Sequence, residues 1–306
     1  MTLKFDTLIA NAPLPEELSA VPTLPVFDDA SCAFVEAFSR DLMQSSEARR
    51  FPELTALAFW FRQTALEKLR TQHELGRGEA LLVPRGTVLH FAPANVDTIF
   101  VYSWFLSLLA GNRNIVRISS KSSPKATLII DILARLLADP AHEGMRQRTV
   151  LLQYDIDDEI TRWLSALCDV RIIWGSDDTV LRIRSIPLPP AAIDVAFANK
   201  YSFALVHAQR FLHASDKQKD AWAEAFYNDA YGFDQMACSS PRLFLWLGNL
   251  QDAHAAAADF WPRVERQVTR RQDRFADLDY INKLVAVDAL AIESNVRIHT
   301  DRKSVV

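Results

Sequence analysis

Strand-like segments rich in β-branched residues alternate with helix-like segments through the middle of the chain, and this alternation limits the fold more than any other feature. Strands are predicted at about 81–92, 114–119, 148–153 and 170–174, each separated from the next by a helical pattern. Such alternation is typical of a parallel sheet covered by helices on both faces, which binds ligands at the carboxyl ends of its strands. The sequence therefore predicts an α/β fold with a Rossmann-type sheet.

Changes in composition divide the chain into three parts. Residues 1–75 are predicted to form a helical segment that packs on the part that follows. A Pro-rich stretch, SIPLPPAAID at 185–194, separates residues 76–190 from residues 191–306. The last part again shows strand and helix patterns, in KYSFALVHA, DKQKDAWAEAFYNDAYG and PRLFLWLG. We therefore expect a second α/β domain there.

The composition excludes several classes of protein. A formal net charge of −4, without any Lys/Arg-rich block, gives no basic surface for nucleic acid. The most apolar run, residues 99–110, has 12 residues, whereas a membrane span needs about 20. Three cysteines at unrelated spacings form neither a disulfide framework nor a metal site. We therefore expect a cytoplasmic protein that holds no metal.

The last six residues, DRKSVV, correspond to the translation of a common sequencing adapter. We therefore expect the second α/β domain to be incomplete, with the natural protein continuing past about residue 300. An ordinary polar C-terminus is the alternative.

Cys238 is the first candidate for chemistry. It lies in GFDQMACSSPR, whose Gly, Asp, Ser and Pro residues predict a turn between a helix and a strand. Backbone N–H groups at such a turn lower the pKa of a thiol, and the thiolate is the nucleophilic form. A small, inert packing residue is the alternative. A Cys–His pair would require the fold to bring in His90, His207 or His213.

Polar residues also follow three of the predicted strands. In HFAPANVDT, at 90–98, the Asn95 side chain either caps the next helix or donates to an oxyanion. RISS at 117–120 and WGSDDT at 174–179 each join a strand to a helix, and helix N-termini of this kind bind phosphate. The chain has no G-x-G-x-x-G sequence, so the usual dinucleotide fingerprint is missing.

Five segments in this order resemble the acyl-CoA reductases of the LuxC type, which supply fatty aldehyde to bacterial luciferase and belong to the aldehyde dehydrogenase superfamily. The segments are GTVLHFAPANV, SLLAGNRNIVRISSKSS, VRIIWGSDDTVLRIRS, FANKYSFALV and FDQMACSSPRLFLW, within about residues 76–248. The resemblance implies an aldehyde-dehydrogenase-like fold, with a cofactor-binding domain at 76–190 and a catalytic domain at 191–306. It also explains the missing fingerprint, because this superfamily holds its nucleotide without one.

The resemblance also implies a role for each matching position. Cys238 matches the family nucleophile, with Gln235 before it, and Asn95 matches the asparagine that binds the oxyanion. Arg117 stands where many aldehyde dehydrogenases have lysine, which favours the 2′-phosphate of NADPH, with NADH as the alternative. The cofactor groove would be lined by Ala92, Pro93, Arg117, Ser119, Gly175, Ser176 and Thr179.

One departure from the superfamily pattern indicates the direction of the reaction. The segment AFANK, at 196–200, has Ala196 where hydrolytic aldehyde dehydrogenases have a glutamate base. Without a base to activate water, an acyl-cysteine is kept for hydride. The resemblance therefore implies NADPH-dependent reduction of a long-chain acyl-CoA to fatty aldehyde through Cys238.

Two alternatives stay open. One is an NAD(P)-dependent aldehyde-oxidising dehydrogenase on the same fold. The other is an inactive or truncated acyl-binding subunit of a fatty acid reductase complex, which would accept an acyl group and release no aldehyde. The expected partner is acyl-CoA or a protein that activates or transfers the acyl group, and both a homo-oligomer and a hetero-oligomer fit the resemblance.

Overall fold

The computed structural model describes residues 4–93, 96–120, 123–200, 202–231, 237, 239–271, 288 and 292. The chain divides into two compact units, residues 1–199 and 200–306. Each unit has its own sheet and its own buried apolar core.

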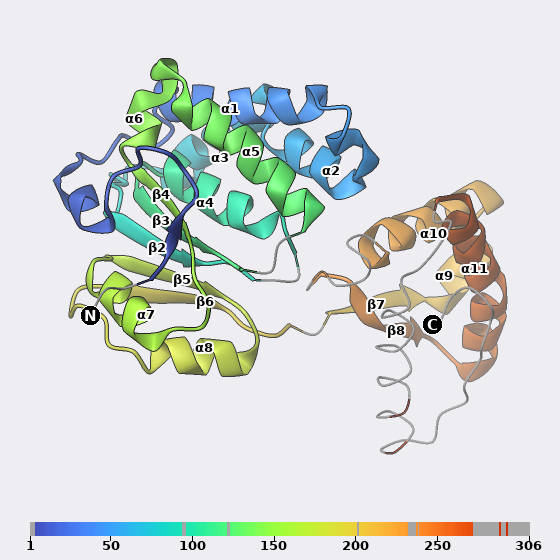
Figure 1. Ribbon diagram of the computed structural model, residues 1–306. Coiled ribbons are helices and arrows are strands. Elements are labelled where there is room, and N and C mark those ends of the chain that lie inside the picture. The colour runs from blue at the N-terminus through green and yellow to red at the C-terminus, as the bar shows by residue number, and fades with distance from the viewer. Residues whose placement is uncertain are drawn as a thin grey trace. The chain divides into compact units, whose positions relative to one another are not determined.

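The first unit is built on a six-stranded sheet with the order β1-β4-β3-β2-β5-β6 (Figure 1). Its strands are β1 (Asp6–Thr7), β2 (Thr87–Phe91), β3 (Arg113–Ile118), β4 (Thr149–Gln153), β5 (Val170–Trp174) and β6 (Ile193–Phe197). β2 to β6 run parallel, and β1 is antiparallel to β4. β2 lies between β3 and β5, so the carboxyl ends of β2 and β5 flank the topological switch point, where sheets of this kind bind ligands.

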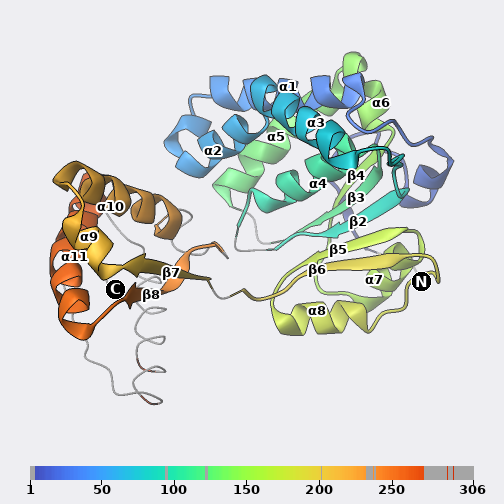
Figure 2. The same cartoon turned by 180° about the vertical axis from the view of Figure 1, so that it is seen from behind.

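Helices cover both faces of this sheet (Figures 1 and 2). One face carries α1 (Asp29–Gln44), α2 (Pro52–Trp60), α3 (Gln63–Arg77), α4 (Ile99–Leu109), α5 (Pro124–Ala138) and α6 (Glu143–Arg146), and the other carries α7 (Asp158–Ala166) and α8 (Asp177–Arg184). Short 3-10 turns form η1 (Pro15–Ala20), η2 (Ala48–Arg50) and η3 (Pro140–His142). The predicted parallel α/β fold is confirmed.

The N-terminal helices join the sheet through an aromatic core. Phe34 and Phe38 of α1 meet Phe105 of α4 edge to face, with ring centroids 5.8 and 5.1 Å apart. Edge-to-face pairs of this kind stabilise a core beyond the area that they bury. The segment that the periodicity predicted as helical is therefore part of the first unit's core.

Two helix ends show how single residues set the bounds of the helices. Ser123 caps α5 by accepting a hydrogen bond from the Ala126 N–H at 3.0 Å, and Pro124 is the first residue of the helix. Gly111 follows α4 with a φ of 84°, and a Cβ at this position would lie 2.0 Å from the Leu24 carbonyl oxygen. Both the positive φ and the close approach require glycine.

Two boundaries differ from the sequence prediction. The strand expected at 81–92 is shorter, because Pro84 has no N–H to donate and Leu81 and Val83 are 83% and 66% exposed. The Pro-rich stretch connects α8 to β6, and β6 pairs with β5 in the first sheet. The division between the units therefore follows residue 199, whereas the composition suggested residue 190.

The second unit contains a pair of parallel strands with helices packed on one face. The strands are β7 (Ser202–His207) and β8 (Pro241–Leu247), and the helices are α9 (Ala208–His213), α10 (Asp216–Ala230) and α11 (Leu250–Arg271). Phe211, Phe244 and Phe260 pack together between the strands and helices. The opposite face of the strands is apolar and 40–58% exposed, and consists of Phe203, Leu205, Leu243, Leu245 and Leu247.

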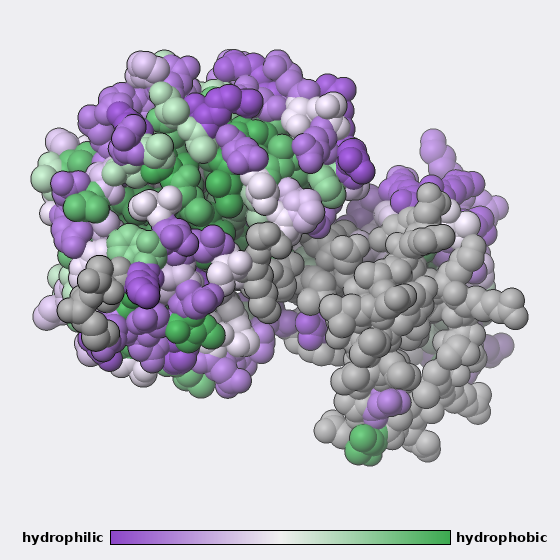
Figure 3. Space-filling view, in the orientation of Figure 1, coloured by the Kyte–Doolittle hydropathy of each residue, from purple (hydrophilic) through white to green (hydrophobic). Residues whose placement is uncertain are grey.

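In the view of Figure 3, the helices of the first unit show hydrophilic residues along the upper rim and an apolar area directly below it. The apolar run at 99–110 forms α4, in which Trp104 and Phe105 are fully buried. None of the helices in the described part of the chain combines the length and the apolar character that crossing a bilayer requires.

Candidate functional site

The predicted cofactor residues of the first unit lie along one edge of its sheet. Ala92 and Pro93 directly follow β2, Arg117 and Ser119 stand at the end of β3, and Gly175 follows β5. The Ala92 N–H donates to the Arg117 carbonyl oxygen at 3.1 Å, which continues the pairing of β2 and β3 past the end of β2. The fold therefore brings these residues to the carboxyl edge, on both sides of the switch point.

Arg117 is held in place by Tyr154. Its Nη2 donates to the Tyr154 carbonyl oxygen at 2.8 Å, and its guanidinium carbon lies 5.3 Å from the centre of the Tyr154 ring. Burial lowers the pKa of Arg117, and burial raises the pKa of the Tyr154 hydroxyl. Next to it, Gln153 Nε2 donates to the Ser119 carbonyl oxygen at 2.5 Å. Arg117 thus brings a fixed positive charge to the edge.

The turn after β5 is compact and leads directly into α8. Ser176 caps the helix, because its Oγ accepts from the Thr179 N–H at 3.3 Å, and the two hydroxyl oxygens lie 3.1 Å apart. A Cβ at Gly175 would lie 2.9 Å from the Thr179 methyl carbon, so a larger residue here would displace the Thr179 side chain. Asp177 and Asp178 in the first turn oppose an anion at this helix end. Any phosphate bound here depends on positive charge from elsewhere on the edge.

An aromatic pair at the same edge had no signal in the sequence. Trp174 ends β5 and Phe197 ends β6, and their rings stack with centroids 3.8 Å apart and planes 7° apart. The Gly175 N–H donates to the Phe197 carbonyl oxygen at 3.3 Å, so the turn and the ring pair are joined. An aromatic residue at a strand end is common in any sheet, and only the pairing of β5 with β6 brings these two together.

Both residues expected to carry the acyl chemistry, Cys238 and Asn95, lie outside the described residues, as does Gln235. The neighbours of Cys238 form a turn at the start of β8, in which the Ser240 N–H donates to the Ala237 carbonyl oxygen at 3.0 Å. Ser240 is 3% exposed, and its Oγ has no hydrogen-bond partner among the described residues. The roles of Cys238 and Asn95 stay predictions.

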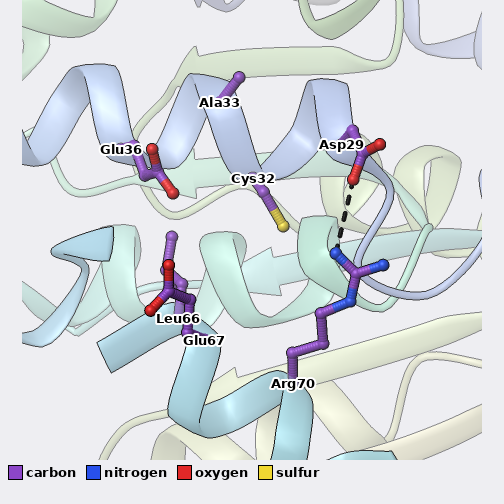
Figure 4. A pocket seen from close by; sticks show the side chains of 7 residues that line it. All are labelled: Asp29, Cys32, Ala33, Glu36, Leu66, Glu67 and Arg70. Atoms are coloured by element: carbon purple, nitrogen blue, oxygen red, sulfur yellow. Dashed lines mark hydrogen bonds and ion pairs between the residues drawn. The ribbon is translucent and has the colours of Figure 1, made fainter. Parts of the chain in front are cut away.

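The other two cysteines are held as thiols. Burial raises the pKa of Cys168 to about 12, and Cys168 is only 2% exposed. Burial also raises the pKa of Cys32, which lines a cavity of about 250 Å³ between α1 and α3 (Figure 4). The carboxylates of Asp29 and Glu36 line the same cavity and also raise the pKa of Cys32, against the opposing effect of Arg70, which pairs with Asp29 there. Neither cysteine has the environment of an activated nucleophile.

Histidines are candidate partners for a nucleophilic cysteine, but both ring nitrogens of His90 already have hydrogen-bond partners. It lies on β2 with none of its surface exposed and bonds to Ser103 and Asn114. In the second unit, His207 directly precedes α9 and His213 is the last residue of that helix. Among the described residues, no group of three or more His, Cys, Asp and Glu side chains is arranged to hold a metal ion.

Solved structures of aldehyde dehydrogenases share this fold. The NAD-dependent benzaldehyde dehydrogenase from Corynebacterium glutamicum superposes with a TM-score of 0.58 at 15% identity, over 95% of this chain and 67% of that one. An NADP-dependent enzyme from E. coli superposes with a TM-score of 0.63 at 14% identity, over 94% of this chain and 63% of that one. The expected aldehyde-dehydrogenase-like fold is confirmed.

Sequence relatives narrow the assignment from the fold to a family. The long-chain acyl-protein thioester reductase of Aliivibrio fischeri is 23% identical over 197 residues, which are 64% of this chain and 37% of the relative. The matched region thus spans just over a third of that relative's length. The family model for acyl-CoA reductase (LuxC) matches residues 16–277, which is most of the chain. The chain belongs to the acyl-CoA reductase (LuxC) family.

Proposed function

We propose that the chain carries out, as a whole enzyme or as part of one, the reduction of a long-chain acyl thioester to the fatty aldehyde with NADPH. The observation that carries this proposal is the family match over residues 16–277. Since a relative is an acyl-protein thioester reductase, the acyl group would arrive either on coenzyme A or on an acyl-carrying partner protein.

The carboxyl edge of the first sheet fits a nicotinamide dinucleotide. The turn after β5 packs Gly175 closely against the Thr179 side chain, so this small residue and the start of α8 lie together at the carboxyl end of β5. Arg117 supplies positive charge for phosphate, and a 2′-phosphate is the reason to prefer NADPH. When bound, the cofactor supplies the hydride. The proposed contacts are Ala92, Pro93, Arg117, Ser119, Gly175, Ser176 and Thr179.

In the proposed reaction the Cys238 thiolate attacks the carbonyl carbon of the thioester. The Asn95 amide and the Cys238 backbone N–H donate to the oxyanion that forms. The bond between that carbon and the sulfur of coenzyme A or the carrier protein then breaks, and this sulfur leaves as a thiolate that takes up the proton consumed in the reaction. Addition of hydride to the carbonyl carbon of the acyl-cysteine gives a hemithioacetal anion. Its collapse breaks the bond to the Cys238 sulfur, which releases the aldehyde and regenerates the thiolate.

Two features of the described residues support this assignment. Cys32 and Cys168 have raised pKa values, so Cys238 is the cysteine whose thiolate we assign to the reaction. Ala196 lies on β6 opposite Ile173, and its methyl group offers no base for water. With no base at this position of the superfamily pattern, the acyl-cysteine would be kept for reduction.

Acylation without cofactor tests the proposal directly. Incubation of the protein with a long-chain acyl-CoA is expected to add one acyl group to Cys238, detected by intact-mass and peptide mass spectrometry. Cys238→Ala should abolish the adduct, whereas the matched change Cys168→Ala should keep it. Addition of NADPH should then release the aldehyde in an amount equal to the adduct.

The two alternative functions predict different results, in the acylation experiment and in a separate incubation with an aldehyde. An adduct that releases no aldehyde with NADPH or NADH would indicate an acyl-binding subunit. Formation of the acid from an aldehyde and NADP⁺ would indicate an oxidising dehydrogenase. The absence of any adduct on the wild-type protein, with acyl-CoA and with an acylated carrier protein alike, would contradict the proposed function.

A further inference from the structure

Four side chains of the first unit form one hydrogen-bonded series across the switch point. His90 Nδ1 on β2 is 2.8 Å from Ser103 Oγ on α4, and His90 Nε2 is 3.0 Å from Asn114 Oδ1 on β3. Ser103 Oγ is in turn 3.2 Å from Nε1 of Trp174, the last residue of β5. The series therefore links three neighbouring strands, β3, β2 and β5, through one helix.

The direction of each hydrogen bond follows from Asn114. Its Nδ2 donates to the Asn112 carbonyl oxygen at 3.0 Å, which leaves its Oδ1 to accept from His90 Nε2. His90 Nδ1 then has a lone pair and accepts the Ser103 hydroxyl proton. The Ser103 oxygen in turn accepts from the Trp174 indole N–H. One arrangement of protons thus satisfies every bond in the series.

The charge state of His90 agrees with this arrangement. The side chain is fully buried, and burial lowers its pKa to about 4. At neutral pH the imidazole is therefore uncharged, with one N–H and one lone pair, as the series requires. A buried polar series in which every group is satisfied is rigid, because any displaced member would leave an unpaired group in the core.

The series ends on the turn of the proposed cofactor site. Trp174 is fixed on one edge by Ser103 and on its ring face by Phe197, which stacks at 3.8 Å. The next residue, Gly175, donates from its N–H to the Phe197 carbonyl oxygen, and Ser176 then caps α8. The Trp174 ring and the turn at 175–176 thus share Phe197 as a neighbour, through its ring and through its carbonyl oxygen.

We propose that His90 and Ser103 are positioning residues that set the Trp174 ring, and with it the turn at Gly175 and Ser176, for dinucleotide binding. The inference rests on the proposed function, because that turn belongs to the proposed cofactor site. The two residues act through Trp174 and have no role in the chemical step itself.

A pair of serines on α4 gives the first test. Ser103 and Ser107 lie one helical turn apart and are 6% and 7% exposed, and Ser107 Oγ has no hydrogen-bond partner among the described residues. Ser103→Ala should weaken NADPH binding about tenfold, as expected for one lost positioning hydrogen bond, whereas Ser107→Ala should change it less than about twofold. Binding is measured by fluorescence titration with NADPH and, in parallel, with NADH.

The indole N–H resonance of Trp174 is the second readout. It is assigned in a ¹H–¹⁵N spectrum as the indole peak that Trp174→Phe removes. Ser103→Ala should shift this peak, because the N–H loses its acceptor, and Ser107→Ala should leave it in place. This readout needs no ligand and no activity.

Two amide variants of His90 separate positioning from general stability. In His90→Asn the side-chain oxygen takes the position of Nδ1 and still accepts from Ser103, while in His90→Gln the longer amide takes the position of Nε2 and keeps only Asn114. Each variant loses one hydrogen bond, so thermal unfolding should place both below the wild type. His90→Asn should nevertheless keep the Trp174 peak and NADPH affinity within about twofold, and His90→Gln should behave like Ser103→Ala.

The outcomes separate the two proposals. An unmoved Trp174 peak in Ser103→Ala, or equal losses of affinity in the two His90 variants, would overturn the positioning role. If the wild-type protein binds neither NADPH nor NADH, the cofactor assignment fails, while the Trp174 peak still decides whether His90 and Ser103 set the ring.

Discussion

Arg171 of β5 and Asp194 of β6 form a bidentate ion pair, with an Nε–Oδ1 distance of 2.7 Å and an Nη2–Oδ2 distance of 3.0 Å. The Arg171 side chain is 1% exposed, and its Nη1 also donates to Ser165 Oγ and to the Ile186 carbonyl oxygen. The two residues are opposite one another in the strand register. This buried pair holds β6 on the first sheet, although a Pro-rich loop separates β6 from α8.

Removing the Asp194 carboxylate should strongly lower the stability of the first unit. Asp194→Ala leaves the Arg171 charge buried and unpaired, and we expect the free energy of unfolding to fall by about 3–5 kcal/mol. Asp158→Ala is the control, because Asp158 pairs with Arg182 at a site where the two side chains are 54% and 35% exposed. That change should cost less than about 1 kcal/mol. Urea titration compares the two, and equal losses would contradict a buried pair.

Acid should destabilise the protein through His90. The unfolded chain takes up a proton near the ordinary histidine pKa of about 6.5, whereas burial delays protonation of the folded state to about pH 4. Because the unfolded state binds more protons between these values, the free energy of unfolding falls as the pH falls, by about 3 kcal/mol in total.

His90→Asn has no group that titrates in this window and serves as the comparison. Its stability deficit relative to the wild type should be largest at neutral pH and should shrink toward pH 4, as followed by urea titration at each pH. A deficit that stays constant would mean that His90 does not resist protonation in the folded state.

The three cysteines should differ in their rate of alkylation. Iodoacetamide at pH 7 should label Cys238 first, if its pKa is lowered as proposed, and Cys32 more slowly, because its pKa is raised. Cys168 should be labelled only on unfolding, because its pKa is about 12 and its side chain is buried. Peptide mass spectrometry at timed intervals gives the order, and early labelling of Cys168 would refute this reading of the thiols.

Arg117 should decide between the two nicotinamide cofactors. Arg117→Met removes the positive charge from the end of β3, and we expect NADPH affinity to fall about tenfold or more, while NADH affinity changes less than about threefold. The two dissociation constants come from fluorescence titrations of the same preparations. Equal losses of affinity for NADPH and NADH would mean that Arg117 does not bind a 2′-phosphate. Its role would then be to stabilise the strand ends through its contact with Tyr154.

Two glycines should respond to alanine in opposite directions. Gly111→Ala is expected to destabilise the first unit by more than about 1 kcal/mol, because φ is 84° and the new Cβ would meet the Leu24 carbonyl oxygen. Gly144→Ala, in α6, meets no atom within 4 Å and should stabilise by about 0.4–1 kcal/mol. Thermal unfolding of both variants checks the sign.

The α/β core was predictable from the sequence because its strands are buried on both faces. β2, β3 and β4 are short strands in which most residues are buried, and the apolar pairs at their centres, Val88-Leu89, Ile115-Val116 and Val150-Leu151, are the signal. β6 lacks that signal, since alternate residues are exposed and the Pro-rich loop precedes it. Its membership of the sheet is seen only in the backbone pairing with β5 and in the Arg171–Asp194 pair, which joins residues 23 positions apart.

The candidate site was only partly predictable for a related reason. Strand ends can be read from local pattern, so Ala92, Arg117 and Gly175 were expected at one edge, and the strand order brings them there. The hydrogen-bond partners at this edge are distant in the sequence and cannot be read from local pattern. Ser103, for example, lies in the middle of an apolar helix, 71 residues from Trp174. A buried serine of this kind looks like a packing residue until its neighbours are known.

The short strand β1 also has a consequence for how the protein behaves in solution. Asp6 and Thr7 pair with Gln153 and Leu152, and the Leu8 N–H donates to the Leu151 carbonyl oxygen at 2.9 Å. These few residues occupy the open edge of β4, which would otherwise present a row of unpaired backbone groups to other chains. Residues 6–8 thus protect β4 from edge-to-edge pairing with other chains. A truncation that removes these residues, or a tag that disturbs them, should therefore promote aggregation.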